Sequence, residues 1–263
     1  MKQLNDAHQL YMKKKRRHNF LIHFIRLLIL TVFIAGWEIL SSREIISSFI
    51  FSSPGRIINC LVELSKNGFL FKHIRITVFE TLICFTIVML SALVLSIIMW
   101  LNRNIFEVIE PYLILLNSIP KSALAPLLIV WLGNNTKTII IAAASVAVFG
   151  AVLSMYTAFI ETDPEKIRLI KTLGGKKKHI LTLLVLPSSL PSIVNIMKVN
   201  LGLSLVGVII GEFLAAKEGL GYMIIYGSQV FKMDWVILSI LLLLILSGFL
   251  YVVIRFFERK TMK

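Results

Sequence analysis

Cysteine is scarce in this sequence, and the motifs that usually build metal, nucleotide or catalytic sites are missing. The two cysteines, Cys60 and Cys84, lie far apart and form no Cys-x-x-Cys pair, and the five histidines are scattered. The sequence therefore predicts neither a disulfide framework nor a metal site. It also has no phosphate-binding glycine loop, no Gly-x-Ser-x-Gly and no His-Glu-x-x-His. We predict a protein that is not an enzyme, needs no cofactor and does not itself hydrolyse nucleotide.

Charged residues are also few, and long apolar runs take their place. Hydrophobic residues make up 57% of the 263 residues and charged residues 16%, a balance that a soluble domain of this length does not need. A run of roughly 17–25 apolar residues can cross a bilayer as a helix. We predict an all-α polytopic membrane protein with six spans, at about 20–40, 74–101, 108–132, 138–160, 193–215 and 235–257.

Acidic residues are half as numerous as basic ones, 14 against 28, and the basic residues are unevenly placed. If the N-terminus is cytoplasmic, the segments on that side of the membrane hold 17 of the 28 Lys and Arg residues and the outer segments seven. This positive-inside bias predicts that both termini are cytoplasmic. The tail 1–19 then anchors the chain at anionic lipid and binds no nucleic acid. The same topology predicts that Cys60 is accessible from outside the cell and that Cys84 is hidden in a span.

One amphipathic segment, residues 161–191, interrupts the apolar sequence on the predicted inner side. Asp163 can cap a helix whose first residue is Pro164, and Gly174 can end it. Apolar residues recur in it at helical spacing: Ile167, Ile170 and Leu173. The Leu-Pro pair at 186–187 is expected to break the helix before the next span. Such an element suits docking to another protein, and the alternative is a basic loop that only sets topology.

A series of motifs runs in order from about residue 51 to the C-terminus. Its members are Ser53-Pro54 followed by Ile57, the run Asn117–Gly133 with Pro120 and Pro126, the segment 161–191, and the run Val208–Tyr222 with Gly219-Leu220-Gly221. In order and spacing they resemble the permeases of binding-protein-dependent ABC importers of the nitrate/sulfonate/taurine branch. Segment 161–191 resembles their EAA coupling loop, although Arg168-Leu169-Ile170 replace its Glu-Ala-Ala core.

This resemblance implies the fold, the location and the partners of the protein. Residues 20–263 would form a MetI-like permease domain of a type I ABC importer, multi-pass in the bacterial plasma membrane. The partners would be a pair of cytoplasmic ABC ATPase subunits, an extracytoplasmic solute-binding protein, a second permease copy in a homodimer, and membrane lipid. The residues that the resemblance assigns to ATPase coupling are Glu161, Asp163, Pro164, Glu165, Arg168, Leu169, Ile170, Leu173, Gly174, Leu186 and Pro187.

Charged residues and prolines within the predicted spans are candidates for a translocation pathway or its gate, because charge inside a bilayer is costly. They are Glu80, Pro120, Lys121, Pro126, Lys198 and Glu212. The alternative is that they form buried structural pairs. Glu80 and Asn117 stand where many relatives have Arg, which makes an anionic cargo less obvious. The cargo stays open among nitrate, sulfonates, taurine, a thiamine-related pyrimidine and a flavin precursor.

Other function classes predict patterns that this sequence does not show. A secondary transporter would have inverted repeats with broken helices in matching halves. A membrane-embedded enzyme would cluster acids or histidines at one membrane face. A permease of another ABC branch would keep the loop at 161–191 but would lose the segment Pro120–Pro126.

Overall fold

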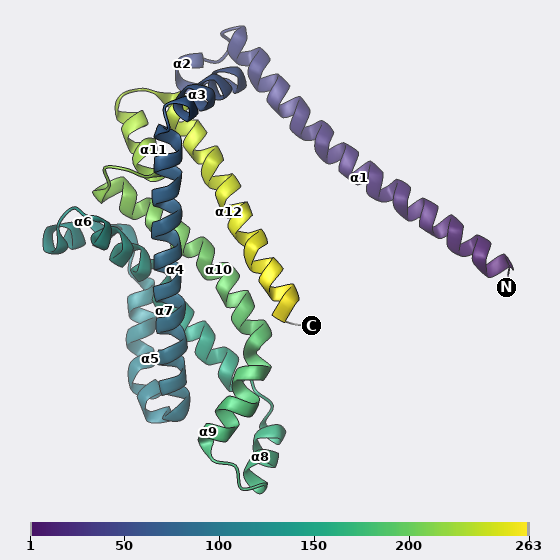
Figure 1. Ribbon diagram of the computed structural model, residues 1–263, viewed down its shortest axis with the longest axis vertical. Coiled ribbons are helices and arrows are strands. Elements are labelled where there is room, and N and C mark those ends of the chain that lie inside the picture. The colour runs from purple at the N-terminus through teal and green to yellow at the C-terminus, as the bar shows by residue number, and fades with distance from the viewer. Residues whose placement is uncertain (1, 262–263) are drawn as a thin grey trace.

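In the computed structural model the chain is helical throughout, apart from short connections, over the residues that it describes, 2–261 (Figure 1). Some side chains in this range lie outside the description, namely those of 2–14, Arg16, Asn19, His23, Lys121, Ser122, Ala125, Phe257, Lys260 and Thr261. The long helices are α1 (Lys2–Ser42), α4 (Phe69–Leu101), α7 (Thr136–Ile160), α10 (Leu186–Ala215) and α12 (Met233–Thr261). The short ones are α2 (Ser48–Phe51), α3 (Pro54–Lys66), α5 (Arg103–Ser118), α6 (Lys121–Leu132), α8 (Pro164–Thr172), α9 (Lys177–Ile180) and α11 (Leu220–Gln229).

Five stretches of the described residues are long and apolar enough to cross a membrane, which confirms the polytopic all-α prediction. They are Phe20–Ser42, Phe69–Leu101, Thr136–Ile160, Lys177–Ala215 and Met233–Phe256. The predicted third span is wrong as a single helix, because α5 ends at Ser118 and α6 begins at Lys121. Pro120 forces the residue before it, Ile119, into an extended conformation, with φ −66° and ψ 132°. After this break α6 turns away from α5, which lies along α4 and α7 (Figure 1).

The predicted helix break at Leu186-Pro187 is also wrong. Helix α9, a π-helical turn over Leu181–Val185 and α10 follow one another without interruption as one apolar helix, Lys177–Ala215. In the π turn the Leu186 N–H bonds to the carbonyl of Leu181, five residues back. This wider turn, placed directly before Pro187, makes room for a ring that would clash with the preceding turn of an ordinary α-helix.

Helices α4, α7 and α10 pack against one another at the centre of the bundle. Small residues bring α7 and α10 close together, because a Cβ on Gly207 would lie 2.8 Å from the backbone of Ala143. A Cβ on Gly211 would lie 2.9 Å from Ile139. Without a hydrophobic driving force inside lipid, such close backbone contact is what holds membrane helices together.

The bundle has two distinct ends, and α1 and α12 both run away from the end that carries α2, α3 and α11 toward the termini of the chain (Figure 1). We call the end with α2, α3 and α11 the α11 end, and the end with α8 and α9 the α8 end. Helix α1 joins the basic segment 1–19 to the first span and departs from the bundle at the α11 end, where it contacts α2 and α3. Apart from Ser41 near its end, the described side chains of its apolar stretch are not buried within this chain, so in a bilayer the stretch faces lipid or another membrane subunit.

Polar contacts hold α1, α3 and α12 together at the α11 end. The Gly55 N–H at the start of α3 donates to Glu38 Oε2 of α1 at 2.9 Å. Arg56 of α3 forms an ion pair with Asp234 of α12 at 2.9 Å, and the Ser52 hydroxyl donates to the same carboxylate at 2.6 Å. These contacts fix how the chain enters α3.

The two cysteines are both buried. Cys84 is fully buried in α4, in agreement with its predicted place in a span. The prediction that Cys60 is accessible is wrong, because the face of α3 that carries it packs against α12 and leaves the side chain 8% exposed. Burial, and then the negative charge of Asp234, raise the pKa of the Cys60 thiol to about 11. This thiol is therefore a poor nucleophile near neutral pH.

Candidate functional site

Helix α4 carries a row of polar side chains on its buried face, toward the α11 end. His73, Thr77 and Glu80 are each no more than 2% exposed, and their spacing of four and three residues places them on one side of the helix. Opposite this row lie the last turn of α10, with Glu212, and the start of α11. Buried polar groups need partners, and most of these find them in the backbone of α11.

His73 and Thr77 bind the first N–H groups of α11. The Gly219 N–H donates to His73 Nδ1 at 2.8 Å, and the Leu220 N–H donates to Thr77 Oγ1 at 2.8 Å. The first N–H groups of a helix have no partner within it and together carry partial positive charge. Two side chains of α4 therefore hold the start of α11 in place.

Glu212 completes this attachment from α10. Its Oε2 accepts the Gly221 N–H at 2.6 Å, and its Oε1 accepts the Thr77 hydroxyl at 2.7 Å. The carboxylate lies so close to the backbone that a Cβ on Gly221 would be 2.8 Å from Oε2, and one on Gly219 would overlap the carboxyl group. Gly219 also has φ +116°, which side chains rarely permit. The Gly-Leu-Gly sequence is thus required by the position of Glu212.

Glu80, the third residue of the row, has unused bonding capacity. Its carboxyl group interacts with Glu212 and with Thr136 at the start of α7. Glu80 Oε2 has no hydrogen-bond partner among the described residues. An unpaired polar atom at this depth is costly, and a ligand that donated to it would remove that cost.

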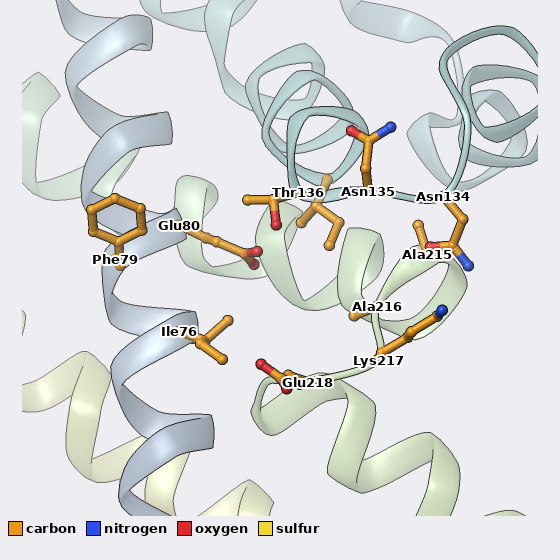
Figure 2. A pocket seen from close by; sticks show the side chains of 11 residues that line it. Ile76, Phe79, Glu80, Asn134, Asn135, Thr136, Ala215, Ala216, Lys217 and Glu218 are labelled. Atoms are coloured by element: carbon orange, nitrogen blue, oxygen red, sulfur yellow. The ribbon is translucent and has the colours of Figure 1, made fainter.

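Glu80 faces a cavity of about 430 Å³ between α4, the start of α7 and the loop that follows α10. The lining residues are Ile76, Phe79, Glu80, Asn134, Asn135, Thr136, Ile139, Ala215, Ala216, Lys217 and Glu218. In Figure 2 the Glu80 side chain extends from α4 toward Thr136, while Lys217 and Asn134 lie on the other side of the cavity. Glu218 is paired with Lys72 of α4, so its charge is already balanced.

The remaining candidates for a pathway lie apart from this cavity. Lys198 of α10 pairs with Glu258 of α12 at 2.8 Å, and both side chains are mostly buried, so the pair joins two helices. Pro120 lies at the break between α5 and α6, and Pro126 is exposed on α6. Lys121 begins α6, and its side chain lies outside the described part of the chain. Of the six candidates, the structure brings Glu80 and Glu212 together.

Segment 161–191, which resembles a coupling loop, contains the predicted helix, and this helix is α8. The Glu165 N–H donates to Asp163 Oδ1 at 2.9 Å, and Pro164 is the first helical residue, as predicted. Gly174 has φ +80°, a left-handed conformation that fits its predicted place at the end of the helix. Two bonds at this end, from Gly174 N–H to the Lys171 carbonyl at 3.0 Å and from Gly175 N–H to the Ile170 carbonyl at 2.9 Å, form a Schellman motif.

Helix α8 has an inner face and an exposed apolar face. Ile167 and Ile170 are partly buried against the hydrophobic core, and α8 contacts α9. Leu169 and Leu173 are 60% and 79% exposed, one helical turn apart. Of the other residues assigned to coupling, Leu186 is half-buried. The rest are exposed, namely Glu161, Asp163, Pro164, Glu165, Arg168, Gly174 and Pro187.

Several residues of these sites are not among the sequence-based candidates. His73 and Thr77 were detectable, because they lie at helical spacing from Glu80 in an otherwise apolar run. Gly175 follows Gly174 directly, and a Cβ on it would overlap Ile170. The contribution of Thr136 was not detectable, because it comes from a helix start far away in the sequence.

Comparisons with known proteins agree with the fold. Residues 92–263 match the family of binding-protein-dependent transport system inner membrane components. The putative aliphatic sulfonates transport permease protein SsuC of Bacillus subtilis (strain 168) is 24% identical over 90% of this chain and 86% of its own length. The formylaminopyrimidine transport permease protein ThiX of Halalkalibacterium halodurans is 29% identical over 71% of this chain and 74% of its own length.

A solved structure supports the same assignment of the fold. A chain of the MetNI methionine ABC transporter in an inward-facing conformation superposes with a TM-score of 0.62 at 18% sequence identity. The superposition covers 73% of this chain and 94% of the MetNI chain. The predicted MetI-like fold is therefore confirmed.

Proposed function

Because this chain belongs to the family of binding-protein-dependent transport system inner membrane components, we propose that its helix α8 is the contact through which an ATPase subunit drives transport. The chain is the transmembrane permease subunit of an ABC importer, and thus a transport component rather than an enzyme. This membership sets aside a secondary transporter and a membrane-embedded enzyme. Permeases of this kind work with an ATPase subunit and a solute-binding protein.

The observation that carries this proposal is the exposed apolar pair Leu169 and Leu173 on a helix with both ends held. Exposed leucines at the end of a bundle, beside charged residues, are typical of a protein-binding surface. The surface carries Arg168 near the two leucines, so the partner surface that fits it is an apolar pocket with an acidic rim.

The same helix is suited to passing on a movement. Its inner residues Ile167 and Ile170 pack on the hydrophobic core, and α8 contacts α9, so a displacement of α8 is passed to α9 and to α10, which continues from α9 as one helix. We expect closure of the ATPase pair on nucleotide to shift α8 as a rigid body. The transported solute would then reach one side of the membrane or the other according to which state the ATPase contact favours.

Orientation and assembly complete the proposal. The α8 end and both termini would be cytoplasmic, in keeping with the Lys and Arg distribution and with termini that point away from the α11 end. The solute-binding protein would then meet the α11 end. A second copy of the chain would complete the pathway, and the exposed apolar surface of α1 would face lipid or that copy.

The cargo would be a small polar solute. Relatives are named for aliphatic sulfonates and for formylaminopyrimidine, and both are small enough for the cavity of about 430 Å³ at Glu80. A pathway residue at Glu80, with Glu212 fixing the adjacent start of α11, fits this role.

The test is to replace Leu173 with glutamate in the permease reconstituted with its ATPase and binding protein. Leu173→Glu should insert normally, since the side chain is exposed, but should lose ATPase co-purification and solute-stimulated ATP hydrolysis. Leu173→Met, which keeps the apolar surface, is the matched control and should behave as wild type. Normal ATPase binding and hydrolysis in Leu173→Glu would remove α8 from the mechanism.

A further inference from the structure

The cavity at Glu80 is polarised, with an unsatisfied acceptor on one side and free donors on the other. On the acceptor side, Glu80 is 2% exposed and its Oε2 has no partner among the described residues. The neighbouring Glu212 is fully occupied by Thr77 and by the N–H groups at the start of α11. The unused capacity of the buried pair is therefore concentrated on Glu80, which needs a hydrogen-bond donor.

On the opposite side, Lys217 and Asn134 supply donors (Figure 2). Lys217 is exposed and makes no ion pair within the part of the chain that the structure describes. Glu218, its neighbour, is engaged by Lys72, so it does not neutralise Lys217. The donors on this side are thus free to bind an acceptor or an anionic group.

Apolar side chains also line the cavity. Ile76 and Phe79 come from α4, and Ala215 and Ala216 from the end of α10. Its volume of about 430 Å³ lies in the range of small-molecule sites. An arrangement of acceptor, apolar wall and donor is complementary to a small molecule with a donor and an acceptor joined by a short carbon chain.

We propose that this cavity binds a small dipolar solute, with an N–H donor group against Glu80 and an acidic or acceptor group toward Lys217 and Asn134. A simple anion would leave Glu80 unpaired and would meet its carboxyl group. A simple amine would satisfy Glu80 and leave Lys217 without a partner. The inference rests on the proposed function in one respect, that the bound solute is the cargo of the importer.

The experiment measures binding to the full-length permease in lipid nanodiscs, without ATPase or binding protein, by ligand-observed NMR titration. Three matched probes differ in one group each: taurine with both ends, ethanesulfonate without the amine, and ethylamine without the sulfonate. Taurine should bind most tightly. Glu80→Gln should weaken taurine and ethylamine by about tenfold or more, the effect of losing one charge-assisted hydrogen bond.

Lys217→Gln should weaken taurine and ethanesulfonate and leave ethylamine unchanged. Because Lys217 is exposed, this variant decides the question even if Glu80→Gln fails to insert. Glu63→Gln and Lys137→Gln, exposed residues outside the cavity lining, are the matched charge controls and should bind all probes as wild type. Equal affinity for taurine and ethanesulfonate, or unchanged taurine affinity in Lys217→Gln, would overturn the proposal.

The outcome of this binding experiment is independent of the outcome of the Leu173→Glu test of α8. Leu173→Glu should bind taurine in nanodiscs as wild type does, because the substituted side chain lies at the other end of the bundle. Loss of ATPase association with intact probe binding would support both proposals. Intact ATPase association in that variant would contradict the coupling role and leave the result on the cavity unaffected.

Discussion

Among single residues, Glu212 and Glu80 show how two similar carboxyl groups acquire different roles. Both are buried, yet Glu212 accepts the Gly221 N–H and the Thr77 hydroxyl, whereas one oxygen of Glu80 stays unpaired. Glu212 is therefore suited to holding α11, and Glu80 to contacting a ligand. The difference comes from their neighbours, because Glu212 accepts an N–H group from the start of α11 and, in the described part of the chain, Glu80 accepts none from the start of α7.

Replacing Glu212 tests whether this residue attaches α11 or contacts a ligand. Glu212→Gln exchanges one acceptor oxygen for an NH₂ group that cannot accept the Gly221 N–H or the Thr77 hydroxyl. Leaving such a buried group unpaired costs about 1–3 kcal/mol, so we expect a lower midpoint of thermal unfolding in detergent and lower abundance in the membrane. Glu80→Gln should lower the midpoint less, because it leaves the bonds to α11 intact.

A contrary result would also be informative. If Glu212→Gln kept wild-type stability and lost solute-stimulated ATP hydrolysis per assembled complex, Glu212 would belong to the pathway rather than to the attachment of α11.

At the scale of elements, α8 is short and owes its shape to its ends. Nine residues make a marginal helix in isolation, and the Asp163 cap and the Schellman motif at Gly174 satisfy several of its free backbone groups. The π turn before Pro187 shows the same dependence on local backbone geometry, since it allows α10 to continue where an α-helical register would break.

Gly174→Val should therefore disturb α8 without preventing insertion. Gly174 has φ +80° and open space around it, so the penalty comes from the backbone conformation, about 1–2 kcal/mol or more for a β-branched residue. We expect weaker co-purification of the ATPase at normal membrane abundance. Gly202→Val, on α10 with open space and no positive φ, is the control and should keep ATPase binding.

At the scale of the whole molecule, α7 and α10 connect the α8 end to the cavity. They start and finish near the two sites, and α7 packs closely on α10 through Gly207 and Gly211. Two helices in such close contact move together, which allows an event at α8 to reach Glu80 and the start of α11.

This contact predicts the effect of adding one methyl group. Gly207→Ala places a Cβ 2.8 Å from the backbone of Ala143, so α7 and α10 must separate, and overpacking of this kind costs about 1–3 kcal/mol. We expect a lower midpoint of thermal unfolding in detergent. Gly202→Ala on the same helix meets no atom within 4 Å and should not lower the midpoint. Equal midpoints for the two variants would show that the packing adjusts without loss.

The local elements of this protein could be predicted from its sequence. Hydropathy determined its class as an all-α membrane protein, and the Asp163-Pro164 start and the Gly174 end determined α8, because caps depend on residues close in sequence. The order of motifs was sufficient for the family. Even the row His73, Thr77 and Glu80 was readable as one face of a helix.

The tertiary structure decided which contacts these elements make with one another. Several contacts join residues more than fifty positions apart. They are the pairing of Glu80 with Glu212, the bonds of His73 and Thr77 to the start of α11, and the ion pair of Lys198 with Glu258. Burial of Cys60 and continuity of α10 through Pro187 likewise depend on neighbouring helices and backbone register. Residue spacing specifies which side chains share one face of a helix, but the packing of the complete bundle decides which other helix that face contacts.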